Sequence, residues 1–297
     1  MKLATTIIDF RNYTSDAIKA MEYIAKAGFK YIDYSFCVDY NNKVGFFGSD
    51  ENHLQKVINK AAELGVKFVQ AHAPFKMLMF EGDTTDLLNA TLKCVNVCAK
   101  LGIKTLVVHT GYAHNLTKEQ TYAKNKEFFA PVLELAKELG IYILAENFNK
   151  MFMDGVYWID NANDLCDFID FVNHPNLKAV WDTGHGNLQD MPQHEQLKVL
   201  AGKVMALHVQ DNHGGDDEHI APFFGTLNLD SVMKGLIDID YKGYFTFEAD
   251  NFFLASKREF DGENKLRLPS IELMIQAEAL LYQLGKEILT KYNMFEE

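Results

Sequence analysis

Residues 117–147 read TKEQTYAKNKEFFAPVLELAKELGIYILAEN, and they contain the repeating unit that decides the fold. The first part is a helical pattern that ends at Gly140, a residue type that readily adopts the left-handed conformation found after helices. A short apolar run over residues 141–147 follows at once. Near-continuous hydrophobicity of this kind is typical of a parallel strand covered on both faces. The stretch therefore predicts a helix that leads directly into a buried parallel strand.

Apolar runs of the same kind recur along the whole chain, rich in β-branched and aromatic residues. They span residues 3–8, 30–36, 66–72, 105–111, 141–147, 177–183, 204–210 and 244–250. Helical patterns separate them, and four of these patterns finish on glycine shortly before the next strand, at Gly28, Gly65, Gly102 and Gly140. We expect Ser15 to be the N-cap of the first helix.

The alternation of strands and helices, with no linker or low-complexity tract, predicts one α/β domain over residues 1–297, a single (β/α)8 TIM barrel. A doubly wound open sheet is the alternative. In that fold the first strand usually leads into a glycine-rich phosphate loop, and residues 5–16, TTIIDFRNYTSD, contain no GxGxxG pattern. We therefore expect the barrel.

Composition favours a small-molecule partner. The net charge is −12, and the three arginines, Arg11, Arg258 and Arg267, form no basic stripe of the kind that nucleic-acid binders carry. The cysteines form no CxxC pair and are expected to be reduced thiols. No apolar segment approaches the roughly 20 residues of a membrane span, and the N-terminal run is too short for a signal peptide. We expect a cytoplasmic protein with no membrane or nucleic-acid partner that can form a homo-oligomer.

Six consecutive predicted strands end on a side chain that can bind metal. These residues are His72, His109, Glu146, Asp182, His208 and Glu248. A single residue of this kind is usually a hydrogen-bonded or solvated group, but in a barrel the carboxyl ends of all the strands converge at one mouth. Several carboxylates in one pocket cannot all stay ionised without a counter-charge. The coincidence therefore predicts a bound divalent cation.

Further polar candidates follow two of these strands. His185 comes three residues after Asp182, with Gly184 in the turn between them. In the polar loop over residues 208–225, Asp217 and His219 are spaced so that both side chains point the same way if the chain is extended. His213, in the same loop, is expected to be solvated.

Short motifs at these positions resemble those of a known superfamily. They are HAP (72–74), VVHTG (107–111), AEN (145–147), WDTGH (181–185), LHVQDN (207–212), DEH (217–219) and FEAD (247–250). In residue type and order they resemble the xylose isomerase-like TIM barrels. That superfamily unites sugar and sugar-phosphate isomerases and epimerases with the family 2 AP endonucleases, such as endonuclease IV.

The resemblance implies a metal-dependent sugar or sugar-phosphate isomerase or epimerase of the ketose 3-epimerase or aldose-ketose isomerase type. The implied metal ligands are Glu146, Asp182, His208 and Glu248. The implied chemistry is proton abstraction next to a carbonyl through a metal-stabilised cis-enediolate, in which both glutamates transfer protons and His185 contacts the substrate's oxygens. We expect Mn²⁺, with Zn²⁺, Co²⁺ or Mg²⁺ as alternatives, and a role in carbohydrate metabolism.

Other functions stay open. The endonuclease branch holds additional zinc ions, and its extra ligand places match His72, His109, His185, Asp217 and His219. An endonuclease IV-like phosphodiesterase on abasic DNA, a keto-inositol dehydratase-type lyase and a non-catalytic binding barrel are therefore alternatives. Gly184 favours the epimerase-like branch, because the endonuclease motif has cysteine there.

Two features of the mouth bear on the substrate. The loop over residues 219–226 is atypical: residues 221–228 read APFFGTLN, where isomerases commonly show a PPGEG turn, so the substrate of a relative does not transfer directly. Phe75, Tyr112, Phe148 and Phe252 either form an apolar wall against the sugar or pack the barrel top.

Overall fold

The computed structural model describes residues 1–37, 51–76, 78–149, 151, 156–253, 266 and 268–297. Its strands are β1 (Leu3–Thr6), β2 (Tyr31–Ser35), β3 (Lys67–His72), β4 (Thr105–Val107), β5 (Tyr142–Glu146), β6 (Leu177–Asp182), β7 (Val204–His208) and β8 (Phe245–Phe247). All the paired strands run parallel, in the order β7-β6-β5-β4-β3-β2-β1-β8. The predicted single (β/α)8 barrel is confirmed.

The barrel closes between β7 and β8 through a narrow junction. One parallel bridge joins Val209 to Phe247. Two backbone hydrogen bonds support it, from Val209 N to Thr246 O at 2.7 Å and from Glu248 N to Val209 O at 3.1 Å. Closure therefore depends on residues directly beside the last two strand ends.

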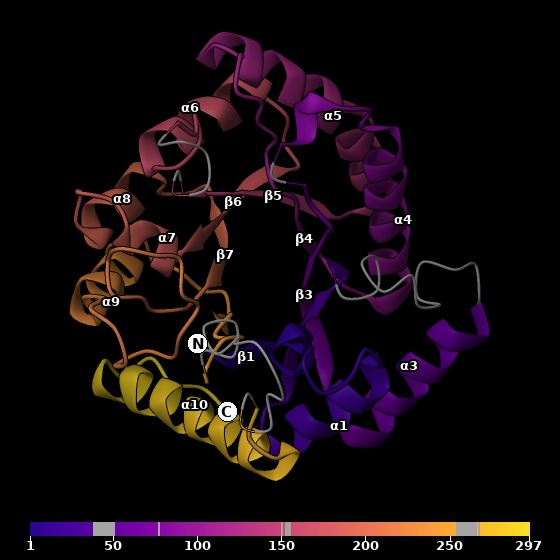
Figure 1. The fold of residues 1–297 in the computed structure, drawn as a ribbon, viewed down its shortest axis with the longest axis vertical. Helices are drawn as coiled ribbons and strands as arrows, with labels where there is room; N and C mark the ends of the chain where they lie inside the picture. Colours follow the sequence, from indigo (N-terminus) through magenta and orange to yellow (C-terminus); the bar gives the residue numbers. More distant parts are fainter. Residues whose placement is uncertain (38–50, 77, 150, 152–155, 254–265, 267) are drawn as a thin grey trace.

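Helices surround the barrel, as Figure 1 shows in a view along its axis. They are α1 (Ala17–Ala27), α3 (Glu51–Leu64), α4 (Thr85–Leu101), α5 (Lys118–Leu139), α6 (Ala162–Val172), α7 (Thr183–Asn187), α8 (Gln193–Val199), α9 (Leu229–Asp238) and α10 (Ile271–Lys291), with the 3-10 helices η1 (Ile7–Phe10) and η2 (Met79–Glu81). The N-cap prediction for α1 was wrong: Asp16, not Ser15, accepts from Ile18 N at 2.9 Å. A carboxylate is a strong acceptor at this position because it also faces the positive end of the helix dipole.

Two apolar layers hold the barrel together. The larger core lies between the strands and the surrounding helices. A smaller cluster consists of Val107, Leu144, Val180 and Ala206. Each of these four residues precedes a predicted site residue by two positions, and side chains two apart on a strand point the same way. The cluster is therefore the apolar floor beneath the polar strand ends, one layer deeper in the barrel.

Register shifts on two strand pairs align polar residues across the barrel wall. The shift between Ile32 and Asp33 brings Asp33 opposite Gln70 on β3. The shift on β6 brings Asp182 opposite His208 on β7. Irregularities of this kind re-aim side chains and are over-represented next to active sites.

Two further structural features concern the thiols and the helices. All four cysteines are free, and Cys37, Cys94 and Cys98 are buried. Within the described residues, no helix combines the length and the apolar character needed to cross a membrane.

Candidate metal centre

The strand-end residues meet at the carboxyl mouth of the barrel, within reach of one another. Their ligand atoms form three groups, in each of which all the atoms lie within 4.8 Å of one another. We call them the central group (Glu146, Asp182, His208 and Glu248), the histidine group (His72, His109 and Glu146) and the outer group (His185, Asp217 and His219). Every site residue predicted from the sequence belongs to one of the three.

The central group is built around one imidazole nitrogen. His208 Nδ1 lies 2.8 Å from Glu146 Oε1 and 3.2 Å from Glu248 Oε2. Asp182 lies beside His208 in register on the neighbouring strand. Glu146, Asp182 and His208 are almost fully buried, whereas the Glu248 side chain is 15% exposed. The group thus opens to solvent on the side of Glu248.

The histidine group shares Glu146 with the central group through the other carboxylate oxygen. His109 Nε2 lies 3.1 Å from Glu146 Oε2, and His72 Nε2 lies 3.6 Å from the same atom. The two imidazole nitrogens are 3.0 Å apart. The strand expected over residues 105–111 ends at Val107, so His109 reaches the mouth from the segment after β4.

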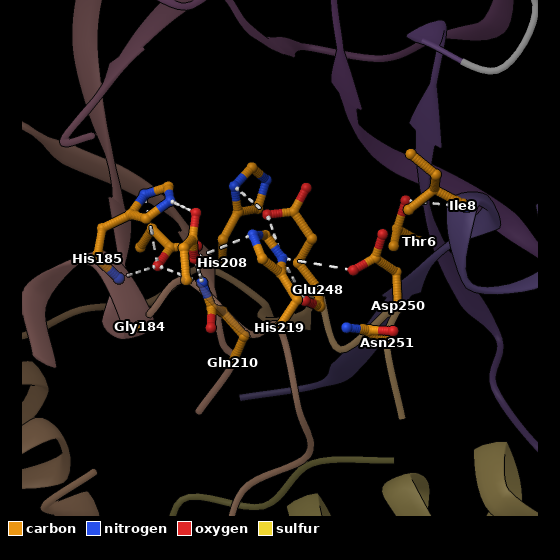
Figure 2. A network of polar contacts seen from close by, with 12 residues as sticks. Thr6, Ile8, Gly184, His185, His208, Gln210, His219, Glu248, Asp250 and Asn251 are labelled. Atoms are coloured by element: carbon orange, nitrogen blue, oxygen red, sulfur yellow. Dashed lines mark hydrogen bonds and ion pairs between the residues drawn. The ribbon is translucent and has the colours of Figure 1, made fainter. Parts of the chain in front are cut away.

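The outer group comes from α7, which contains His185, and from the loop after β7, which contains Asp217 and His219. Figure 2 shows His185 and His219. Asp217 bridges its two imidazoles: Oδ2 is 3.1 Å from His185 Nε2, and Oδ1 is 3.3 Å from His219 Nε2. The extended conformation considered for this pair is absent, because His219 has a φ of 51°. His213 is exposed and pairs with Glu218 at 2.6 Å, outside all three groups.

Carboxylates and imidazoles in the site shift one another's pKa. Burial lowers the pKa of His185, but the carboxylates of Asp182 and Asp217 outweigh burial and raise that pKa well above its usual value. Burial raises the pKa of Asp182 to about 6, although His185 opposes the shift. Burial also disfavours ionised Glu146, but His208 and other imidazoles hold its pKa well below the ordinary value. Imidazoles and carboxylates in the site therefore stabilise one another's charged forms.

The central group fits a divalent cation. Asp182 Oδ2 is buried and has no hydrogen-bond partner among the described residues. An orphaned carboxylate oxygen is costly in a buried site unless a cation or another donor satisfies it. Carboxylate oxygens with one imidazole nitrogen are ligands that Mn²⁺, Co²⁺, Zn²⁺ and Mg²⁺ accept.

Sequence reasoning missed two amide side chains that contact Asp182, one of which also contacts the outer group. Gln210 Nε2 donates to Asp182 Oδ1 at 3.2 Å and to Asp217 Oδ1 at 3.0 Å. Asn147 Nδ2 donates to the main-chain oxygen of Asp182 at 2.9 Å. The available signal was an amide residue directly after an apolar strand, as in AEN and HVQ. These amides fix the orientation of Asp182 without being ligands themselves.

The four aromatic residues predicted near the mouth differ in solvent exposure and in their contacts with the site. Phe75 is 41% exposed and stacks on His109, with ring centroids 4.4 Å apart. Phe148 is buried and meets the same imidazole edge-on at 5.1 Å. Tyr112 is buried and Phe252 is half-buried. Phe75 is thus the aromatic candidate that combines exposure with a contact to a predicted site residue.

Of the three arginines, Arg11 alone lies within the described residues. Arg258 and Arg267 lie outside the described residues. Arg11, from the segment after η1, forms an ion pair with Asp250. Asp250 Oδ1 in turn lies 3.5 Å from His219 Nδ1 (Figure 2). Arg11 therefore contacts the outer group indirectly, through a carboxylate.

Comparison of the sequence with known proteins finds curated relatives that match part of this chain. A fructoselysine 3-epimerase of Escherichia coli O157:H7 is 27% identical over 151 residues, which cover 50% of this chain and 53% of the relative. An uncharacterized protein of Methanocaldococcus jannaschii is 27% identical over 192 residues, covering 62% of this chain and 64% of the relative. The chain thus spans between half and two thirds of the length of these curated relatives.

The whole fold is shared with a solved structure. The crystal structure of a D-tagatose 3-epimerase-like protein superposes with a TM-score of 0.75 at 21% identity, covering 99% of this chain and 98% of that one. In sequence, residues 21–265 match the family described as xylose isomerase-like TIM barrel. That match covers most of the chain and includes all three ligand groups. The chain therefore belongs to the xylose isomerase-like TIM barrel family.

Proposed function

We propose that this protein is a metal-dependent isomerase or epimerase of a small sugar or sugar phosphate, of the ketose 3-epimerase or aldose-ketose isomerase type. The observation that carries the proposal is the convergence of Glu146 and Glu248 on His208 Nδ1, at 2.8 and 3.2 Å. Two carboxylates, one at the end of β5 and one directly after β8, thus border one point at the mouth. Relatives named as 3-epimerases of sugars and a sugar derivative support the same reading.

The reaction moves a proton at the carbon next to a carbonyl. Glu146 and Glu248 would hold the metal together with Asp182 and His208, and a bound divalent cation supplies charge stabilisation for the oxyanion that develops. Epimerisation removes a proton from one face of the carbon and returns it on the other, which two separate carboxylates can do. His185 would hold a substrate hydroxyl or oxyanion.

We expect Glu146→Gln and Glu248→Gln each to lower kcat by about 10²- to 10⁴-fold, because each amide removes one proton-transfer group. Steady-state kinetics with the best substrate of a ketose panel measures the effect. Glu195→Gln, on the exposed face of α8, is the matched control and should keep full turnover. Near-wild-type turnover in either site variant would contradict the two-glutamate scheme.

The substrate class is tested by hydrogen exchange at carbon. The Mn²⁺-loaded protein is incubated in D₂O with ketoses, ketose phosphates and keto-inositols, and the unreacted and product pools are analysed by NMR and mass spectrometry. Incorporation of carbon-bound deuterium supports the proposal. Loss of water from a keto-inositol would instead identify the lyase alternative, which uses the same first proton abstraction.

A second function is favoured by one specific observation. The histidine group and the outer group flank the central group, and Glu146 belongs to two of the three groups. An endonuclease IV-like phosphodiesterase would use such a set to hold several zinc ions around a phosphate. We keep this function as the second candidate.

Zinc content and substrate cleavage separate the two candidates. The zinc bound per chain is measured by mass spectrometry after dialysis, and the same preparation is assayed on a duplex with one abasic position. About three zinc ions per chain together with strand cleavage would favour the phosphodiesterase. Deuterium exchange into a sugar without strand cleavage would favour the isomerase, whatever the number of bound ions.

A further inference from the structure

A polar pair lies on the side of His208 that faces away from the central group's glutamates. Asp33 on β2 and Gln70 on β3 are opposite each other in register and are both almost fully buried. Gln70 Nε2 donates to Asp33 Oδ2 at 2.7 Å. His208 Nε2 lies 3.3 Å from the same carboxylate oxygen and 2.8 Å from Gln70 Nε2. The pair thus contacts the one ring nitrogen of His208 that the glutamates do not.

The burial of the Asp33 carboxylate has to be compensated by other interactions. Taking a carboxylate out of water is costly unless its oxygens are paired. Asp33 Oδ1 has no hydrogen-bond partner within the described part of the chain. The described polar contacts of Asp33 are made through Oδ2, to Gln70 and His208. Its stabilising partners are therefore these two side chains.

The two ends of the His208 imidazole have different surroundings. Nδ1 faces Glu146 and Glu248, and Nε2 faces Asp33 and Gln70. A neutral imidazole carries a single ring proton, and a nitrogen that binds metal must be free of it. If Nδ1 is to bind a cation in the central group, the proton has to reside on Nε2.

Asp33 and Gln70 favour opposite positions of that proton. A carboxylate only accepts, so Asp33 stabilises the tautomer in which Nε2 carries the proton and donates it. Asp33 also fixes the Gln70 amide, because the amide nitrogen and not the oxygen must face a carboxylate. The amide nitrogen can donate its second hydrogen to His208 Nε2. Nε2 accepts only when it carries no proton, so Gln70 favours the tautomer protonated on Nδ1.

We infer that Asp33 is a positioning residue that holds His208 in the tautomer able to bind metal through Nδ1, and that Gln70 stabilises the opposite tautomer. The inference rests on the proposed function in one respect, the presence of a metal in the central group. A carboxylate that accepts the second N–H of a ligating histidine orients the ring and increases its basicity, and its loss typically weakens metal binding about 10- to 100-fold. With Nδ1 holding a metal, the Nε2 proton would be donated to Asp33, and Nε2 would no longer accept from Gln70.

Metal affinity provides the first test, independent of turnover. Zn²⁺ dissociation constants are measured by competition with a chromogenic chelator for the wild type, Asp33→Asn and Gln70→Leu. We expect Asp33→Asn to bind Zn²⁺ about 10- to 100-fold more weakly, and Gln70→Leu to bind at least as tightly as the wild type. Asp160→Asn, which also neutralises a buried carboxyl but outside the three ligand groups, is the control and should bind like the wild type.

The tautomer itself provides the second test, by ¹⁵N NMR of histidine-labelled protein with and without Zn²⁺. The expected result is a proton on Nε2 of His208 in the zinc-loaded wild type, with a smaller population of that tautomer in Asp33→Asn. Equal weakening of Zn²⁺ binding in Asp33→Asn and Gln70→Leu would show a packing role for the pair and overturn the inference. Unchanged binding in Asp33→Asn would overturn it while leaving the proposed function intact. A wild type that binds no metal would overturn both.

Discussion

Gly184 matters because of the side chain that occupies the space beside it. A Cβ at this position would lie 2.1 Å from Cδ and Oε1 of Gln210. Gln210 donates to Asp182 in the central group and to Asp217 in the outer group. The glycine in WDTGH therefore makes room for an amide that connects the two groups. This is a physical reason for glycine where the endonuclease motif has cysteine.

We expect Gly184→Ala to displace Gln210 and so to lower both activity and stability. Overpacking of this kind costs about 1 to 3 kcal/mol, and misplaced ligands should lower kcat about tenfold or more. Thermal unfolding and steady-state kinetics measure the two effects. Gly215→Ala, where a Cβ meets nothing within 4 Å, is the matched control.

A double variant separates the steric effect from the chemical one. Gly184→Ala combined with Gln210→Ala should recover most of the lost stability, because the clashing side chain is gone, but not the activity. If the double variant stayed as unstable as Gly184→Ala, the clash with Gln210 would not be the cause.

At the level of single residues, ligand candidates were predictable and their supporting side chains were not. Glu146 and Asp182 stand out because each is a charged residue at the end of an apolar run. Asp33 lies inside a strand run, and nothing local distinguishes it from a residue on a solvated edge. Its role depends on a register shift against β3, and such a shift is a property of the assembled sheet, not of either strand alone.

Among the elements, α10 and η1 share a buried pair of carboxyl groups. Asp9 on η1 and Glu278 on α10 are both almost fully buried, and Thr5 donates to Asp9 Oδ2 at 2.6 Å. Burial raises the pKa of Glu278 to about 7. Burial, reinforced by Glu278, raises the pKa of Asp9 well above its ordinary value. The pair therefore favours protonated carboxyl groups where α10 packs on the barrel.

This pair should make folding stability fall as pH rises. Glu278 ionises near pH 4.5 when unfolded and near pH 7 when folded, so its contribution is complete below about 4.5 and is lost as pH rises through about 7. The loss is on the order of 3 kcal/mol. Unfolding midpoints at pH 5 and pH 8 measure it. Glu278→Gln should make the difference clearly smaller, with the remainder due to buried Asp9, whereas Glu287→Gln, in an ion pair on the exposed face of α10, should retain the full difference. The same pH dependence in both variants would exclude Glu278 as the cause.

Element types were predictable, and their ends less so. Residues 244–250 were expected as one strand, but β8 ends at Phe247, because the chain turns there to bring Glu248 and Asp250 over the mouth. The turn after Asp182 proved to be the short helix α7, whose N-cap is Asp182 itself: its Oδ1 accepts from His185 N at 2.6 Å. A residue that both ends a strand and caps a helix carries no sequence signal that tells the two roles apart.

For the whole molecule, the barrel followed from the regular alternation of helical patterns and apolar runs, as in residues 117–147. The grouping of the candidate ligands around the mouth followed from the barrel, because parallel strands present their carboxyl ends on one side. The division of these residues into three groups could not be predicted from the barrel fold. It depends on Glu146 offering one oxygen to each of two imidazole sets, which only the three-dimensional arrangement specifies.

The narrow closure between β7 and β8 places the weakest backbone junction of the barrel between two candidate ligands, His208 and Glu248. Amide hydrogens of Val209 and Glu248, which form the two closing bonds, should exchange with solvent at least about tenfold faster than those of the longer β5–β6 ladder.

A cation held by both His208 and Glu248 would stabilise this junction, because binding to the closed form alone makes its opening less favourable. Hydrogen–deuterium exchange with and without Mn²⁺ would therefore show protection concentrated at residues 204–210 and 244–250. Uniform protection across all strands would contradict this coupling. The metal would then stabilise the closed barrel in addition to its role in the reaction.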